Sequence, residues 1–227
     1  MKNIIKFFIF FLTVFTYAQK LEKDSLHKQI KDIETVVIND RDYEKIAYSF
    51  ALKKEINSRL RSINPNSAYE MGLRFNNNLG KKGILSNVIL FLHKTDSEGI
   101  LTDLEINIYK IDTLTNKPGE KLNKEQIVYT PKTKKRGNVK INIENFRIPF
   151  PIEGVVVTIK WLPTKAHDKA VGPAIRLTNY TERLTYTRFD NDTTKWSNAL
   201  NFSTKNGVYT NVMMGLEVYI KKRKNNE

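Results

Sequence analysis

From Ser67 onward the chain consists of short β-prone runs separated by Gly, Asn, Asp and Pro, a spacing that leaves little room for helices. Residues 104–108 alternate apolar and polar side chains, as a strand with one buried face does. The run 155–162 is dense in Val, Ile and Trp, which predicts a central strand buried on both faces. About eight or nine such strands predict a mainly all-β fold, an antiparallel β-sandwich or jelly roll.

The segment before the β-rich region follows a different pattern. Residues 19–66 read as a leader with one short strand-like run, Thr35-Val36-Val37-Ile38. Between Asp42 and Ile63 there is no Gly or Pro, and several apolar residues fit one helical face, which favours a helix there. We therefore expect a sandwich domain over 67–220, followed by a basic tail over 221–227.

The first eighteen residues have the three parts of a secretory signal peptide. Lys2 and Lys6 precede an uncharged apolar run over 7–17, which is too short to span a bilayer comfortably. Small residues before the junction predict cleavage between Ala18 and Gln19. The protein is thus expected to be exported to the periplasm, the cell surface or the medium, and no later segment is apolar enough to form a transmembrane helix.

The chain contains no cysteine, although export would permit disulfides. Stability must therefore come from an ordinary core, and thiol catalysis and thiolate metal sites are excluded. The lipid-acceptor cysteine of a bacterial lipoprotein is also absent, so we expect the leader to be removed without leaving an acylated anchor.

The formal net charge is +14, and the loss of the two leader lysines leaves +12. Such a charge favours anionic partners. Because the excess is spread along the chain, no nucleic-acid partner is expected. Two local clusters stand out, Lys132-Thr133-Lys134-Lys135-Arg136, which reads as a hairpin turn before Gly137, and residues 221–224, which read as a solvated tail.

Motifs for catalysis, cofactors and metals are missing. The three histidines, His27, His93 and His167, lack zinc-site spacing, and no nucleotide-binding fingerprint is present, so no catalytic residue, cofactor or metal ligand is assigned. The acids Glu70, Glu105 and Glu153 are interpreted as outward strand or turn residues. Two carboxylates brought together by the fold would suit a glycosidase, which sequence spacing cannot test.

Aromatic residues near the C-terminus offer a candidate ligand surface made of Tyr186, Arg188 and Trp196. Aromatic rings beside arginines can stack sugar rings or anchor a protein partner. The alternative is that these rings fill the core, as alternating aromatics in strands usually do. Both readings stay open at this stage.

A resemblance to a known protein family rests on four runs that occur in a fixed order. They are AYEMG at 68–72, EINIYKID at 105–112, PGEKL at 118–122, and PIEGVVV at 151–157, which leads to Trp161. They resemble the C-terminal β-sandwich of secreted Bacteroidetes proteins of the carboxypeptidase-like regulatory-domain and TonB-receptor-associated kind. The resemblance implies a sandwich, supplies no catalytic residues, and lacks the regulatory-like domain itself.

Together these features predict an exported, non-enzymatic β-sandwich acting as a binding or cell-envelope assembly module, with a glycan or an envelope protein as partner. One alternative is a jelly-roll glycan-active enzyme using a carboxylate pair. The other is a protein that binds anionic envelope components electrostatically through the basic turn and tail.

Overall fold

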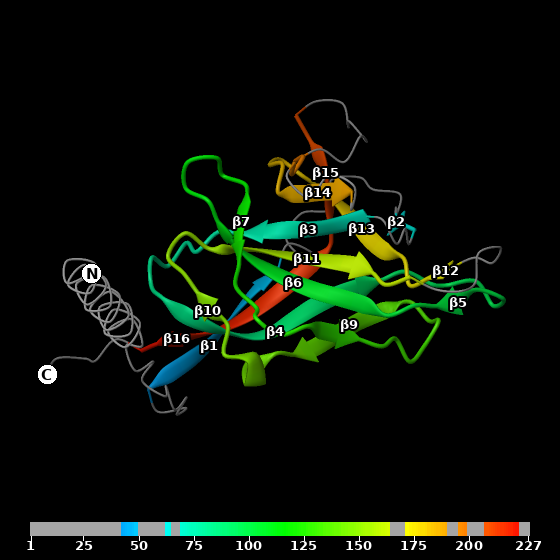
Figure 1. Cartoon of the computed structure of the whole chain (residues 1–227), viewed down its shortest axis with the longest axis horizontal. Coiled ribbons are helices and arrows are strands. Elements are labelled where there is room, and N and C mark those ends of the chain that lie inside the picture. The colour runs from blue at the N-terminus through cyan, green and yellow to red at the C-terminus, as the bar shows by residue number, and fades with distance from the viewer. Residues whose placement is uncertain are drawn as a thin grey trace, which may run out of the picture. The chain divides into compact units, whose positions relative to one another are not determined.

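Two large antiparallel β-sheets make up most of the computed structural model (Figure 1). The structure describes residues 42–49, 62–64, 69–163, 171–189, 195–198 and 207–222. The expected signal peptide, its junction at Ala18 and Gln19, the strand expected at 35–38, His27, His167 and the tail beyond Lys222 lie outside these residues. No helix in the described part of the chain is long and apolar enough to cross a membrane.

The eight-stranded sheet has the order β1-β16-β4-β13-β15, with β9 and β10 also paired to β4 and β2 paired to β13. Its strands are β1 (Tyr43–Ser49), β2 (Ser62–Ile63), β4 (Gly83–Leu92), β9 (Gly137–Asn142), β10 (Pro149–Phe150), β13 (Ile175–Tyr180), β15 (Tyr209–Val212) and β16 (Met214–Lys221).

The six-stranded sheet has the order β14-β3-β11-β6-β7, with β8 also paired to β6. Its strands are β3 (Tyr69–Phe75), β6 (Leu104–Ile111), β7 (Pro118–Lys121), β8 (Ile127–Tyr129), β11 (Val155–Trp161) and β14 (Thr185–Phe189). A short parallel pair, β5 (Ile100–Leu101) and β12 (Val171–Gly172), and the 3-10 turn η1 (Glu144–Phe146) complete the described elements.

This architecture confirms the predicted all-β sandwich. Strand β11 lies between β3 and β6, and nearly all of its side chains are buried, as its apolar density predicted. The described residues form sixteen strand segments rather than eight or nine, because several are pieces of two to four residues that have no periodic signal of their own.

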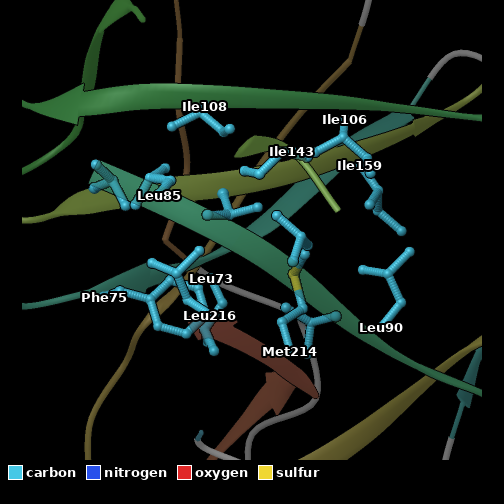
Figure 2. Close-up of a cluster of buried hydrophobic side chains, with 14 of the residues drawn as sticks. Leu73, Phe75, Leu85, Leu90, Ile106, Ile108, Ile143, Ile159, Met214 and Leu216 are labelled. Atoms are coloured by element: carbon cyan, nitrogen blue, oxygen red, sulfur yellow. The ribbon is translucent and has the colours of Figure 1, made fainter. Parts of the chain in front are cut away.

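The core lies between the two sheets and is filled by alternate residues of their inner faces. Figure 2 shows Leu73 and Phe75 of β3 and Ile106 of β6 in the same cluster as Leu85 of β4 and Leu216 of β16. Each of these side chains is fully buried. Burying a side chain of this size contributes about 1.5–3 kcal/mol, so this interlayer cluster is the main source of stability in a chain without disulfides.

The helix expected over 42–63 is wrong for its first part, because residues 43–49 form strand β1. This strand pairs with β16 along its whole length, from Tyr43 opposite Lys221 to Ser49 opposite Gly215. Ile46 and Tyr48 pack against the core. The sandwich therefore begins before residue 67, since tertiary pairing overrides the weak helical periodicity of this segment.

The hairpin expected at the basic cluster is also wrong. Strand β8 pairs with β6 in the six-stranded sheet, whereas β9 pairs with β4 in the eight-stranded sheet. Residues 130–136 therefore carry the chain from one sheet to the other. Val139 and Ile141 of β9 alternate with polar residues, a pattern that is typical of a strand but carries no information about its partner.

Candidate functional site

The outer face of the six-stranded sheet gathers a polar cluster around Glu70 of β3. Pairing places Arg188 of β14 opposite Glu70, and Thr158 of β11 opposite Asn107 of β6. Because alternate residues of a strand share a face, Tyr109 lies on the same side as Asn107. Four neighbouring strands thus contribute to one cluster on the face that points away from the core.

Glu70 is held by an ion pair and by three polar side chains. Arg188 donates from Nη2 and Nε to Glu70 Oε2 at 2.6 and 2.7 Å. Glu70 Oε1 accepts hydrogen bonds from Tyr109 Oη at 3.1 Å, from Asn107 Nδ2 at 3.2 Å and from Thr158 Oγ1. Glu70 thus lies on an outward strand face, as expected, yet its side chain is only 3% exposed.

Trp196 covers this cluster from outside. Its ring meets Tyr109 edge-on with 5.4 Å between centroids, and the Arg188 guanidinium lies 4.4 Å from the Trp196 ring. Backbone hydrogen bonds in both directions between Ser197 and Thr187 hold the tryptophan segment beside β14. Burial, followed by the charge of Glu70, raises the pKa of Tyr109 well above its usual range, so its hydroxyl remains a donor.

The structure brings together the three residues of the predicted ligand surface, Tyr186, Arg188 and Trp196, but it buries two of them. Tyr186 is 3% and Trp196 8% exposed, and both belong to a small apolar cluster with Tyr109. Their rings contact protein rather than solvent, whereas the Arg188 side chain keeps 22% exposure. Ligand binding here stays a prediction, and in the described arrangement the aromatic rings serve as packing.

Tyr186 also supports the turn between β6 and β7. Its hydroxyl donates to the carbonyl oxygen of Asn116, which has a positive φ of 57°. Within the same turn, Asp112 Oδ1 accepts the backbone N–H groups of Leu114 at 2.8 Å and Thr115 at 3.2 Å. These hydrogen bonds lower the pKa of Asp112 below its usual value.

A groove of about 280 Å³ lies beside this turn. Its lining residues include the acids Asp112, Glu120 and Glu153, together with Lys110 and Leu114. Lys110 Nζ lies 3.9 Å from Glu153 Oε1, and the Leu114 side chain is 92% exposed. Glu153 thus lies in a turn as expected, but it faces a charged groove.

A second polar cluster lies on the outer face of the eight-stranded sheet, around Glu144 of η1. Glu144 Oε1 accepts hydrogen bonds from Ser86 Oγ at 2.8 Å, Tyr219 Oη at 3.0 Å and Lys45 Nζ at 3.1 Å. The Lys45 ammonium also lies 4.6 Å from the Tyr219 ring centroid. The hydrogen bond from Ser86 is the largest cause of a pKa of Glu144 that is lower than usual.

Glu217 extends this second cluster. Its carboxylate accepts Asn87 Nδ2 at 2.8 Å and pairs with Lys140 Nζ at 2.7 Å. Asn87 Nδ2 in turn contacts Ser86 Oγ at 2.6 Å, so hydrogen bonds of 2.8, 2.6 and 2.8 Å connect the two carboxylates. These three hydrogen bonds in series limit the distance between Glu144 Oε1 and Glu217 Oε2 to about 8 Å.

Sequence reasoning missed Glu144 and Glu217. The two acids are far apart in the chain, and they meet because a register irregularity between Glu217 and Val218 places Ser86 and Asn87 between them. Such β-bulges redirect side chains and leave almost no trace in a single sequence. The third acid of the earlier interpretation, Glu105, pairs with Lys121 at 3.6 Å.

The remaining candidate chemistry is limited. Over the described ranges, no group of three or more His, Asp or Glu side chains is placed to hold a metal ion. His93 is half-buried at the end of β4, and its Nδ1 lies 3.2 Å from the carbonyl oxygen of Lys94. Comparison of the chain with models of protein families and with curated proteins gives no match.

Proposed function

We propose that this chain is an exported, non-enzymatic β-sandwich protein that acts as a binding or cell-envelope assembly module. The expected signal peptide supports export, and the missing cysteine supports release from the leader without a lipid anchor. A rigid sandwich with charged loops at its ends is a common scaffold for binding.

The non-enzymatic assignment rests on the contacts made by the three carboxylates of the two polar clusters. Glu70 is bound by Arg188, Glu144 by Lys45 and Ser86, and Glu217 by Lys140. A general acid needs a carboxyl group whose pKa is raised by its surroundings. The hydrogen bonds from Ser86 and Lys45 lower the pKa of Glu144 instead, and all three acids are occupied by contacts between elements of the fold.

Two measurements test the proposal. Mass spectrometry of the protein recovered from the envelope or medium should give a chain that begins at Gln19, and a chain that retains Met1 inside the cell would refute export. The purified chain from residue 19 should then bind a glycan on an array, or capture a defined envelope protein, without cleaving polysaccharides. Release of reducing ends from a pure preparation would contradict the non-enzymatic assignment.

The alternative, a glycan-active enzyme, is favoured by the proximity of Glu144 and Glu217. Glycosidases place two carboxylates about 5–10 Å apart, and the hydrogen-bonded connection keeps this pair below the upper limit of that range. With its lowered pKa, Glu144 suits the role of nucleophile or base. Glu217 would then have to act as the acid, but its carboxylate is already paired with Lys140 Nζ at 2.7 Å.

Matched variants separate these functions. Glu144→Gln and Glu217→Gln should each abolish hydrolysis if the pair is catalytic, whereas Glu105→Gln, an ion-paired acid on the other sheet, should leave it unchanged. If all three variants retain the ligand binding of the parent protein and none of the proteins hydrolyses glycans, the enzyme alternative is refuted.

A further inference from the structure

The connection between β8 and β9 carries the densest run of positive charge in the described chain. Residues 132–136, called the basic turn below, hold four cationic side chains in five positions. Lys132, Lys135 and Arg136 are exposed, and Lys94 is exposed in the neighbouring connection that follows β4. Asp96 and Glu98 lie in that same connection, so cations outnumber acids at this end of the sandwich.

The basic turn is fixed by hydrogen bonds. Thr95 N–H donates to the carbonyl oxygen of Lys134 at 2.8 Å, and Lys134 Nζ donates to the carbonyl oxygen of Ser97 at 2.6 Å. Inside the turn, Thr133 Oγ1 accepts the backbone N–H of Lys135 at 3.1 Å. A surface that is already ordered loses less conformational entropy when it binds a partner.

The basic turn and Lys221 lie at opposite ends of β4. Gly137, directly after the turn, pairs with Leu92, whereas Ile220, directly before Lys221, pairs with Gly83 (Figure 1). The ten residues of β4 span about 30 Å at the usual strand rise. Screening by salt limits electrostatic attraction between exposed charges to about 10 Å. Cations at one end of β4 therefore attract a planar partner at the other end only weakly.

We propose that the basic turn is a docking surface for the anionic lipid headgroups of an envelope membrane. This inference rests on the proposed export, and it assigns a partner to one end of the exported module. Several exposed cations on one ordered turn complement a planar array of lipid phosphates. The strongly positive net charge of the whole chain adds a long-range attraction toward the same surface.

Co-sedimentation of the chain from residue 19 with two kinds of vesicle tests the proposal. We expect binding to vesicles that contain phosphatidylglycerol, none to vesicles of phosphatidylcholine alone, and a steep loss with added salt. Each cation near an anionic surface strengthens binding about 5-fold, so Lys135→Gln with Arg136→Gln should weaken it about 30-fold.

A charge-matched control removes the same net charge from the opposite end of β4. Lys82→Gln with Lys221→Gln should change binding by less than about 3-fold, because only the long-range attraction is reduced. Circular dichroism and thermal melting must show that both double variants fold like the parent. We expect both double variants to fold normally, because all four substituted side chains are exposed.

Two results would overturn the proposal. Equal losses in the two double variants would mean that net charge alone drives adsorption. Failure of the parent to bind phosphatidylglycerol vesicles, with binding to an anionic polysaccharide such as alginate instead, would assign the turn to a different partner. Neither result affects the proposed function, which stands or falls on export, ligand binding and the absence of hydrolysis.

Discussion

Replacing Arg188 by methionine tests whether the buried ion pair on the outer face of the six-stranded sheet stabilises the fold as its geometry indicates. The change removes two hydrogen bonds to Glu70 and the contact with the Trp196 ring, and it leaves a carboxylate that is 3% exposed without its cation. Breaking a buried pair in this way costs about 3–5 kcal/mol. We expect the lower end, because Tyr109 and Thr158 still donate to the carboxylate.

Urea denaturation at neutral pH measures this effect. With a slope of about 2 kcal/mol per M, a loss of about 3 kcal/mol lowers the midpoint by about 1.5 M. Arg74→Met is the matched control, because Arg74 lies on the same face of β3 and its Nε donates to Asn76. The control should cost about 1 kcal/mol or less.

A second substitution separates the buried charge from lost packing. Glu70→Gln in the Arg188→Met background removes the unpaired charge while keeping a side-chain oxygen that accepts hydrogen bonds. The double variant should recover at least about 1 kcal/mol relative to Arg188→Met. If it is no more stable than the single variant, or if Arg188→Met itself costs less than about 1 kcal/mol, the account of Glu70 is refuted.

Three further substitutions, the first with a matched control, have expected outcomes. Gly72→Ala should lower the urea midpoint by the equivalent of about 3 kcal/mol or more, because the added Cβ would lie 2.1 Å from the carbonyl oxygen of Val157. Gly137→Ala is the control and should have little effect, because nothing lies within 4 Å of the added Cβ. The lowered pKa of Glu144 stabilises the fold above the unfolded pKa of about 4.3, and this contribution is lost as pH falls through the folded value, so Glu144→Gln should lose less stability on acidification than the parent. Tyr186→Phe should cost about 1 kcal/mol and speed amide exchange at Asn116, whose N–H is bonded within the β6–β7 turn; unchanged exchange there would contradict the supporting role of Tyr186.

The fold class was accessible from the sequence because alternation and apolar density report directly on which faces of a strand are buried. The central position of β11 and the strand at β6 followed from such patterns. The pairing partners of the strands could not be read from these patterns, and the basic turn shows why. Its flanking runs look like the two arms of a hairpin, whereas the partners of β8 and β9 lie in different sheets and are chosen by packing across the core.

Strand β1 illustrates a second limit. Its seven residues fit a helical face as well as an alternating strand, and intrinsic propensity does not separate the two over so short a span. What determines the structure is the full-length pairing with β16, which lies at the other end of the chain. The expected boundary at residue 67 failed for the same reason.

The polar cluster around Glu70 was predictable only in part. Its aromatic and arginine residues could be grouped from the sequence, whereas their pairing with Glu70 could not. Tyr186 and Arg188 are two residues apart in one strand, so they had to share a face, and Trp196 follows closely enough to cover them. The sequence carries no signal that Glu70 lies opposite Arg188, because that pairing depends on the register of β14 on β3. Once a carboxylate lies on an outward face beneath a tryptophan, it needs a cation and several donors to offset its lost hydration. Arg188 is therefore committed to Glu70 before any ligand arrives, and a partner that used Arg188 would have to supply a replacement cation for Glu70. On this reasoning the exposed basic turn, whose charges serve no buried acid in the described chain, is the better place to look for a binding partner.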